Sequence, residues 1–298
     1  MSQRVLCVDI GATSTKAGIV NDAGELSFAD SIPTRGDAEA FLRGICGLIG
    51  QTISAGGPEL RDFAGIGIAV AGFLDADRNC FLYNSNIRWL EGFALRDALA
   101  RCFPVRIELE IDSNAAAMAE WCFGSGRGSR RFLCVTSGTG LGVGMIVDGV
   151  PLRFAYGCLG DIGHIVVQPN GPLCTCGGHG CAEIMVSAPA VAARFRQGAT
   201  LRDVILAARE QDASAISVLN QAGEWLGIAI ASLAQTFFPD HIAVAGGLSE
   251  AGDFLMSTVQ RAFDAHAGDF ARSQTKLMRA VLGSRATLIG AAWPFLQR

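Results

Sequence analysis

Two stretches decide the fold: residues 5–20, VLCVDIGATSTKAGIV, and residues 132–147, FLCVTSGTGLGVGMIV. In each, a short apolar run enters a turn rich in glycine and hydroxyl residues, and a second apolar run leaves it. This pattern predicts a buried hairpin with a tight connection. When residue 5 is aligned with residue 132, the identical pairs are Leu6/Leu133, Cys7/Cys134, Val8/Val135, Gly11/Gly138, Ile19/Ile146 and Val20/Val147.

The matched hairpins favour an internally duplicated α/β chain over a chance likeness between two apolar, glycine-rich hairpins. Periodicity predicts further elements after each copy. They are a helix over 37–53, a strand over 65–71, a helix over 93–102 and a strand over 105–109, then helices across 187–238, a strand over 242–245 and a helix after Gly247. A chain of 298 residues, half of them apolar, fits two lobes and leads us to expect a cleft between them.

Charge and hydropathy exclude several classes of function. The formal charge is -4, with Lys and Arg scattered along the chain, so neither a nucleic-acid surface nor an anionic membrane surface is expected. Asp9 interrupts the first apolar run, which argues against an export signal and for a cytoplasmic protein. The apolar segment 225–239 falls short of the ~20 residues of a membrane span, so a buried helix is expected. The expected partner is a small molecule.

The turns of the two hairpins are candidate phosphate-binding loops. Residues 9–16, DIGATSTK, and residues 136–144, TSGTGLGVG, let the backbone approach phosphate oxygens closely. The carboxylate of Asp9 can hold a magnesium-bound water. Residues 245–249, AGGLS, form a third turn that suits a nucleotide. Each turn has a plain alternative, an ordinary hairpin or strand-to-helix connection, and neither hairpin turn is a P-loop.

Asp112 is the candidate catalytic base. It follows a predicted strand and opens the alanine-rich helix of residues 112–120, DSNAAAMAE, where helix capping is the alternative role. The helix N-terminus should keep its carboxylate ionised at neutral pH, as a base needs. Upstream, residues 83–89, YNSNIRW, gather amide, hydroxyl and aromatic groups that bind a sugar or form an ordinary turn.

Cys174, Cys176 and Cys181 form a C-x-C-x4-C cluster, with His164 ten residues before it. Three thiolates and one imidazole make a closed tetrahedral shell, the pattern of structural zinc. His179 is the second choice for the fourth ligand. The other interpretation is a glycine-rich loop without metal.

These motifs resemble the ROK family of repressors, open reading frames and sugar kinases. The most specific part is Gly160-Asp161-Ile162-Gly163-His164 followed by the cysteine cluster and Glu183. The resemblance implies an actin-like ATPase fold of two RNase-H-like lobes, with ATP and Mg²⁺ in the cleft and a zinc knot. It places residues 1–113 with 286–298 in one lobe and residues 114–285 in the other, and it implies a homodimer.

The resemblance also implies site residues, with Asp112 as base. The implied sugar ligands are Gly72, Asn86, Asp112, Asp161, His164 and Glu183. The implied phosphate and nucleotide residues are Asp9, Gly11, Thr13, Lys16, Gly138, Thr139, Gly140, Gly246 and Gly247. His164, Cys174, Cys176 and Cys181 are the implied zinc ligands.

Three positions depart from the family pattern. Asp161 replaces a glutamate, Ile111 replaces the asparagine before the base, and Ala71-Gly72 replaces a Pro-Gly turn. The first two changes shorten or remove hydrogen-bonding groups, and each lost bond to a buried polar group costs about 1 to 3 kcal/mol. They leave the identity of the sugar open.

The expected activity is ATP-dependent phosphorylation of a hexose or N-acetylhexosamine at the 6-hydroxyl. One alternative is a sugar-responsive repressor, but such repressors carry a DNA-binding segment before the first phosphate turn, which here starts at Asp9. The other is a sugar-binding relative without catalysis, suggested by Ile111 and Asp161.

Overall fold

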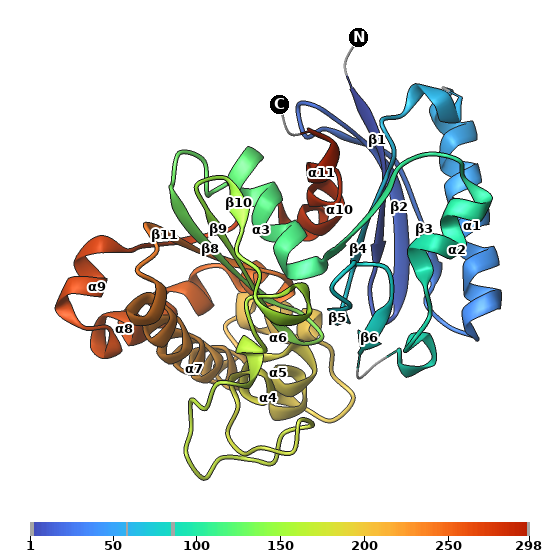
Figure 1. The fold of residues 1–298 in the computed structure, drawn as a ribbon. Coiled ribbons are helices and arrows are strands. Elements are labelled where there is room, and N and C mark those ends of the chain that lie inside the picture. The colour runs from blue at the N-terminus through green and yellow to red at the C-terminus, as the bar shows by residue number, and fades with distance from the viewer. Residues whose placement is uncertain (1–2, 58, 85–86, 297–298) are drawn as a thin grey trace. The chain divides into compact units, whose positions relative to one another are not determined.

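The computed structural model describes residues 3–57, 59–84 and 87–296, and the chain divides into two compact units (Figure 1). Unit 1 comprises Met1–Phe123, Pro151–Gly160 and Arg285–Arg298. Unit 2 comprises Gly124–Val150 and Asp161–Ser284.

Unit 1 is built on a five-stranded mixed sheet with the order β3-β2-β1-β4-β7. β1 pairs antiparallel with β2 and parallel with β4, β2 pairs antiparallel with β3, and β4 pairs parallel with β7. The strands are β1 (Arg4–Ile10), β2 (Ser14–Asn21), β3 (Leu26–Pro33), β4 (Ile66–Val70) and β7 (Ile107–Ile111). Nearly all side chains of β1 and β4 are buried, as expected for central strands covered on both faces.

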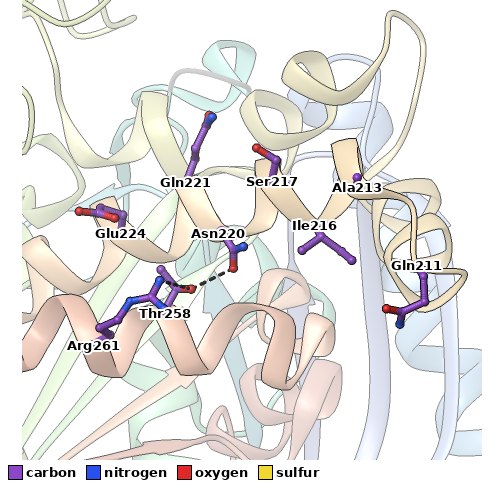
Figure 2. A pocket seen from close by; sticks show the side chains of 9 residues that line it. All are labelled: Gln211, Ala213, Ile216, Ser217, Asn220, Gln221, Glu224, Thr258 and Arg261. Carbon is purple, nitrogen blue, oxygen red and sulfur yellow. Dashed lines mark hydrogen bonds between the residues drawn. The ribbon is translucent and has the colours of Figure 1, made fainter.

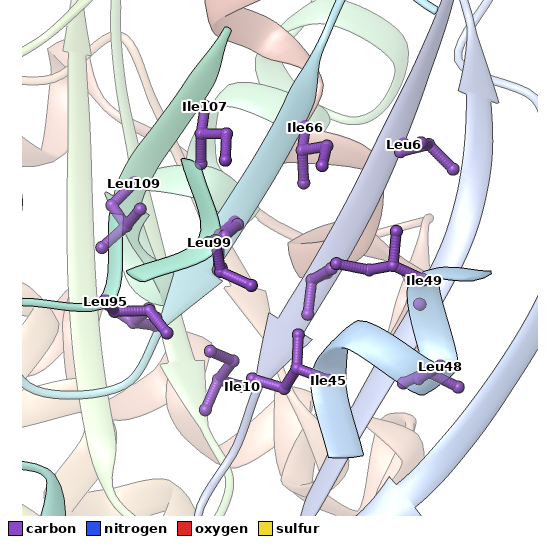
Figure 3. Packing of buried hydrophobic residues seen from close by; sticks show 14 of the residues in the cluster. Leu6, Ile10, Ile45, Leu48, Ile49, Ile66, Leu95, Leu99, Ile107 and Leu109 are labelled. Carbon is purple, nitrogen blue, oxygen red and sulfur yellow. The ribbon is translucent and has the colours of Figure 1, made fainter. Parts of the chain in front are cut away.

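Helices cover both faces of this sheet. α1 (Ala38–Gly56) and α2 (Leu95–Cys102) pack on the face that carries Leu6, Ile66 and Ile107, and Figure 3 shows their apolar side chains meeting there. The other face meets α3 (Asp112–Phe123), α10 (Ala286–Gly290) and α11 (Trp293–Leu296). The smaller elements are the hairpin β5 (Phe73–Leu74) and β6 (Phe81–Tyr83) and the 3-10 turns η1 (Leu60–Asp62), η2 (Arg88–Leu90) and η3 (Ala155–Gly157).

Unit 2 repeats the plan with the sheet order β10-β9-β8-β11-β12. Its strands are β8 (Arg131–Ser137), β9 (Leu141–Val147), β10 (Val150–Pro151), β11 (His241–Ala245) and β12 (Lys276–Arg279). β8 pairs antiparallel with β9, and β11 runs parallel to both β8 and β12. Both predicted hairpins and the repeated plan are therefore confirmed.

The helical part of unit 2 centres on α7, whose glycines allow close packing. The helices are α4 (Ala182–Val186), α5 (Ala188–Phe195), α6 (Leu201–Arg209), α7 (Ala213–Phe237), α8 (Asp253–His266) and α9 (Asp269–Gln274), with 3-10 turns η4 (Ile162–His164), η5 (Gly247–Ala251) and η6 (Gly283–Arg285). A Cβ added to Gly227 of α7 would lie 2.6 Å from the Cβ of Ala262 in α8, so the two helices approach closely. None of the described helices is long and apolar enough to cross a membrane.

The units differ from the predicted lobes at two places. Residues 114–123, most of α3, and residues 151–160 group with unit 1, whereas the prediction placed them in the lobe of residues 114–285. α3 stays with unit 1 because α10 packs directly on it, backbone against backbone. Residues 151–160 stay there because Arg153 and Gly157 bond to Glu110 and Asn114 of unit 1.

The contact between α3 and α10 gives a prediction about stability. A Cβ at Gly290 would lie 1.7 Å from the carbonyl oxygen of Ala115, so Gly290→Ala must push the helices apart. Overpacking of this kind costs about 1 to 3 kcal/mol or more, and we expect a lower thermal unfolding midpoint. Gly50→Ala in α1 is the matched control. It meets nothing within 4 Å and should raise stability by about 0.5 to 1 kcal/mol. Equal midpoints for the two variants would contradict this packing.

Candidate functional site

Two carboxylates of unit 1 lie where strands of its sheet end. Asp9 is the penultimate residue of β1, and Asp112 follows β7 directly as the first residue of α3. Burial and, to a smaller extent, nearby Asp9 raise the pKa of Asp112, the N–H of Ser113 lowers it, and the net result is a pKa of about 7. Burial also raises the pKa of Asp9 to about 6, against the ammonium of Lys16. The two acids are therefore held close together in a poorly solvated place.

The state expected for Asp112 needs correction. We expected the helix N-terminus to keep it ionised, but burial outweighs that effect and leaves its pKa near neutrality. Its carboxylate accepts the N–H of Ser113, the next residue, at 2.7 Å, whereas an N-cap accepts an N–H two or three residues on. Capping therefore does not account for this carboxylate.

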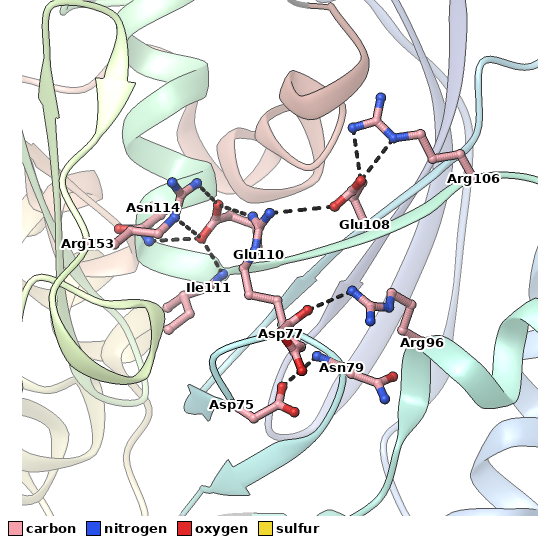
Figure 4. Close-up of polar contacts among 11 residues, drawn as sticks. Asp75, Asp77, Asn79, Arg96, Arg106, Glu108, Glu110, Ile111, Asn114 and Arg153 are labelled. Atoms are coloured by element: carbon pink, nitrogen blue, oxygen red, sulfur yellow. Dashed lines mark hydrogen bonds and ion pairs between the residues drawn. The ribbon is translucent and has the colours of Figure 1, made fainter.

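A buried ionic network is centred on Glu110, two residues before Asp112 (Figure 4). Glu110 on β7 is 2% exposed and accepts the N–H of Ile111 and the Nδ2 of Asn114, each at 2.9 Å. Its other oxygen accepts from Arg153 and, at 3.4 Å, from Arg78. Sequence reasoning missed this network. The sequence feature that could have indicated this network is Glu110 itself, a glutamate at an inward-facing position of the strand 107–111, two residues before the proposed base.

The first phosphate turn joins β1 to β2. The N–H of Gly11 donates to the carbonyl of Ser14 at 3.1 Å, and a Cβ at Gly11 would lie 3.1 Å from that same oxygen. Thr13 is exposed, with its carbonyl accepting the N–H of Thr34 at 3.0 Å. Lys16 on β2 is paired across the ladder with Asp9. The turn thus carries the exposed Thr13 and, next to Asp9, the cation of Lys16.

Gly72 lies against the loop of residues 83–84. Its φ of 108° favours glycine, and a Cβ there would lie 2.4 Å from the carbonyl oxygen of Tyr83. The Nδ2 of Asn84 donates to the carbonyl of Ala71 at 2.7 Å. Gly72 and the loop that begins at residue 83, both predicted to bind the sugar, are therefore in contact. Asn86 itself lies outside the described residues.

Glu183 supports the second phosphate turn in unit 2. Its carboxylate accepts the N–H of Leu141 at 2.9 Å, and it would lie 2.5 Å from a Cβ at Gly140. Gly138 donates its N–H to the carbonyl of Gly140 at 2.9 Å, and Thr139 at the tip is exposed. One predicted sugar ligand is thus placed against a predicted phosphate turn.

The third turn packs on the end of β8. Gly246 has φ 82°, and a Cβ there would lie 2.2 Å from the carbonyl oxygen of Ser137. The neighbouring Gly247 opens η5, and its Cβ would make only ordinary contact with Leu201. Gly246 is therefore required by packing between neighbouring strand ends, and Gly247 is not.

His164, Cys174, Cys176 and Cys181 gather with their ligand atoms all within 4.8 Å of one another. Cys174 Sγ lies 3.5 Å from His164 Nδ1, and the sulfurs of Cys176 and Cys181 are 3.6 Å apart. Tetrahedral zinc with bonds of about 2.3 Å sets ligand atoms about 3.8 Å apart, so the four fit that ion. The alternative ligand His179 contacts the carbonyl of Gly171 at 3.2 Å instead.

Exposed Asp161 lies beside this cluster. One of its oxygens is 3.7 Å from His164 Nε2, the nitrogen that faces away from Cys174. A carboxylate on the second nitrogen of a metal-binding histidine fixes its ring and tautomer.

A separate groove of ≈ 440 Å³ runs along α7 and α8 (Figure 2). Most of the residues that line it have polar side chains, with Thr258 donating to Asn220 at 2.9 Å, and none of the predicted site residues lines it. The groove is therefore separate from the predicted site.

Comparison with known proteins identifies the class. The ROK family model matches residues 5–298, and the chain belongs to the ROK family. The predicted resemblance is confirmed. The chain is 33% identical to a glucokinase of Halalkalibacterium halodurans, over 96% of this chain and 93% of that one. It is 27% identical to the xylose repressor of Bacillus subtilis, over 76% of this chain and 59% of the repressor.

The fold agrees with this class. A ROK family glucokinase from Streptomyces griseus, solved in complex with glucose and AMPPNP, is 30% identical. It superposes with a TM-score of 0.87 over 99% of each chain. This similarity and the two mixed sheets fit the predicted actin-like ATPase fold.

The raised pKa of Asp112 predicts how stability changes with pH. Between about pH 4 and 7 the unfolded chain loses this proton while the folded protein keeps it, so rising pH favours unfolding. The Asp112→Asn variant has no carboxyl group at this position, so it does not lose stability in this way as the pH rises. In protein free of nucleotide and magnesium, the stability of the variant relative to wild type should grow by about 1 kcal/mol or more from pH 4.5 to 7.5. Urea denaturation at several pH values measures it, and a constant difference would contradict the shift.

Proposed function

We propose that this protein is an ATP-dependent sugar kinase that phosphorylates a hexose or N-acetylhexosamine at its 6-hydroxyl. The observation that carries the proposal is Asp112, a poorly solvated carboxylate at a strand end beside Asp9. The glucokinases among its relatives support the reaction, and a general base works best with a pKa near the working pH.

In this mechanism Asp112 accepts the proton of the sugar hydroxyl. The hydroxyl oxygen forms a bond to the γ-phosphorus of ATP, the bond from that phosphorus to the β,γ-bridging oxygen breaks, and ADP leaves. Asp9 is the residue that would hold the magnesium ion through a bound water, and that ion supplies charge neutralisation at the phosphates. The donors we assign to phosphate oxygens are Lys16 and backbone N–H groups of the glycine turns other than those of Gly11, Gly138 and Leu141, which donate within the protein. The sugar-binding roles of Gly72, Asn86, Asp161, His164 and Glu183 stay predictions, as do the nucleotide roles of Gly246 and Gly247.

We assign the four-residue cluster to structural zinc. Three thiolates donate much charge and four protein ligands leave no open position, so the ion would not act on phosphate. Its effect would be to fix the ring of His164. The homodimer and the cytoplasmic location stay predictions, and light scattering across a concentration series tests the first.

A sugar-responsive regulator is the second candidate, supported by the match to a xylose repressor. A catalytically silent sugar-binding protein is the third, suggested by Ile111 and Asp161. Both predict sugar binding without ATP turnover.

A sugar panel separates these functions. We expect ATP consumption with at least one of glucose, mannose, allose, fructose, N-acetylglucosamine and N-acetylmannosamine, measured by coupled ADP release. Asp112→Asn should lower kcat by at least about 100-fold while sugar affinity, measured calorimetrically, stays within a few-fold. A silent wild type with sugar affinity would favour the regulator or the silent binder. Near wild-type kcat in the variant would remove Asp112 as base.

The metal assignment has its own test. Protein purified without chelator should contain one zinc per chain by elemental analysis, and Cys176→Ser should lose it. Exposed Cys102 lies outside the cluster, so Cys102→Ser is the control and should keep the metal. Loss of zinc should weaken sugar binding by roughly 10- to 100-fold through His164. Zinc-free wild type, or unchanged stability and sugar affinity in Cys176→Ser, would refute the assignment.

A further inference from the structure

Glu110 is a buried carboxylate that the proposed mechanism does not use. It lies near the end of β7, two residues before Asp112, with a side chain that is 3% exposed. A buried carboxylate persists only where cations and hydrogen bonds compensate for its lost hydration. The partners that do so here also hold the chain on both sides of Asp112.

One oxygen of Glu110 accepts hydrogen bonds from residues before and after Asp112 in the sequence. Oε1 accepts the backbone N–H of Ile111, the residue before, and the Nδ2 of Asn114, two residues after. Because β7 passes into α3 without a connecting residue, the direction of the Asp112 side chain depends on the backbone at this junction. Glu110 ties the last residue of the strand to the first turn of the helix.

The amide of Asn114 is fully buried and can be oriented in only one way. Its Nδ2 donates both to Glu110 and to the carbonyl of Gly157, at 2.9 Å each. A flipped amide would turn Oδ1 toward these two acceptors, which would repel it. In the observed orientation Oδ1 is buried without a partner among the described protein atoms, a rare and unfavourable arrangement. The contact of Nδ2 with Glu110 is kept despite this cost.

Two guanidinium groups fix Glu110 in turn. Arg153 binds it with two nitrogens and Arg78 binds its Oε2 at 3.4 Å. Arg78 also lies 3.6 Å from Glu108, which pairs with Arg106 at 2.9 Å. With both oxygens engaged, the Glu110 side chain cannot rotate away from the junction.

We propose that Glu110 is a positioning residue for Asp112, an inference that rests on the proposed kinase function. It contacts no reacting atom. It holds the backbone N–H of Ile111, before the base, and the side-chain amide of Asn114, after it, so that the carboxylate of Asp112 meets the attacking hydroxyl in the correct geometry. Misplacing a catalytic group by about 1 Å costs up to roughly 100-fold in rate.

The test compares Glu110→Gln with Glu108→Gln. The first substitution keeps size but loses the charge that both arginines bind. We expect its kcat to fall about 10- to 100-fold, with KM for sugar and ATP within about threefold, because an interaction needed only in the transition state is lost. Glu108→Gln is the matched control, since it lies on the same strand and shares Arg78. It should keep kcat within about twofold.

A double variant shows whether the effect passes through Asp112. If it does, Glu110→Gln should lower the residual rate of Asp112→Asn by less than about twofold. If Glu110→Gln does not fold, Asn114→Ala breaks the same tie without touching the ion pairs, and its kcat should fall with KM unchanged.

The outcomes distinguish this proposal from the function beneath it. An active wild type whose Glu110→Gln and Asn114→Ala variants keep kcat would overturn the positioning role alone. If the kcat of the double variant fell by the product of the two single-variant factors, the positioning role would also be overturned. A wild type without turnover on the sugar panel would overturn the proposed function and this inference together.

Discussion

Parallel pairing of β1 with β4 and of β4 with β7 places Asp9, Ala69 and Glu110 in one row of the sheet. Parallel strands end at the same edge, so a residue just beyond β7 comes close to the end of β1. The chemistry of unit 1 depends on this register. It brings Asp112 near a second carboxylate in a poorly solvated place, and both pKa values rise as a result.

Such a site destabilises the fold that carries it, and unit 1 compensates through neighbouring groups. Lys16 lies across the ladder from Asp9 and lowers its pKa. The guanidinium of Arg153 binds Glu110 instead of either acid. Among the described residues no cation pairs with Asp112, which also has no capping role, and its carboxylate stays available to take a proton near neutral pH.

What the sequence could predict was local. The hairpins at 5–20 and 132–147, the main helices and the cysteine cluster each carry their pattern within a few residues. The strands of β12 and of the β5–β6 hairpin were missed because they are short and half exposed, with no apolar period. The compact units have other bounds than the predicted lobes because the packing of α10 on α3 joins distant segments. For the same reason the bond between Arg153 and Glu110, 43 residues apart, left no local signal.

The glycines of the turns show how far a motif supports a function. Gly246 lies against the backbone of Ser137, so the protein needs it whether or not phosphate binds. Gly140 lies against the carboxylate of Glu183, and a side chain there would displace that carboxylate from its hydrogen bond with Leu141. Neither glycine is therefore specific evidence for a ligand. At Gly138 a Cβ would meet nothing within 4 Å, and its backbone is not left-handed. The protein's own packing does not require a glycine there, so Gly138 is stronger evidence for a close-approaching ligand than the two glycines that packing explains.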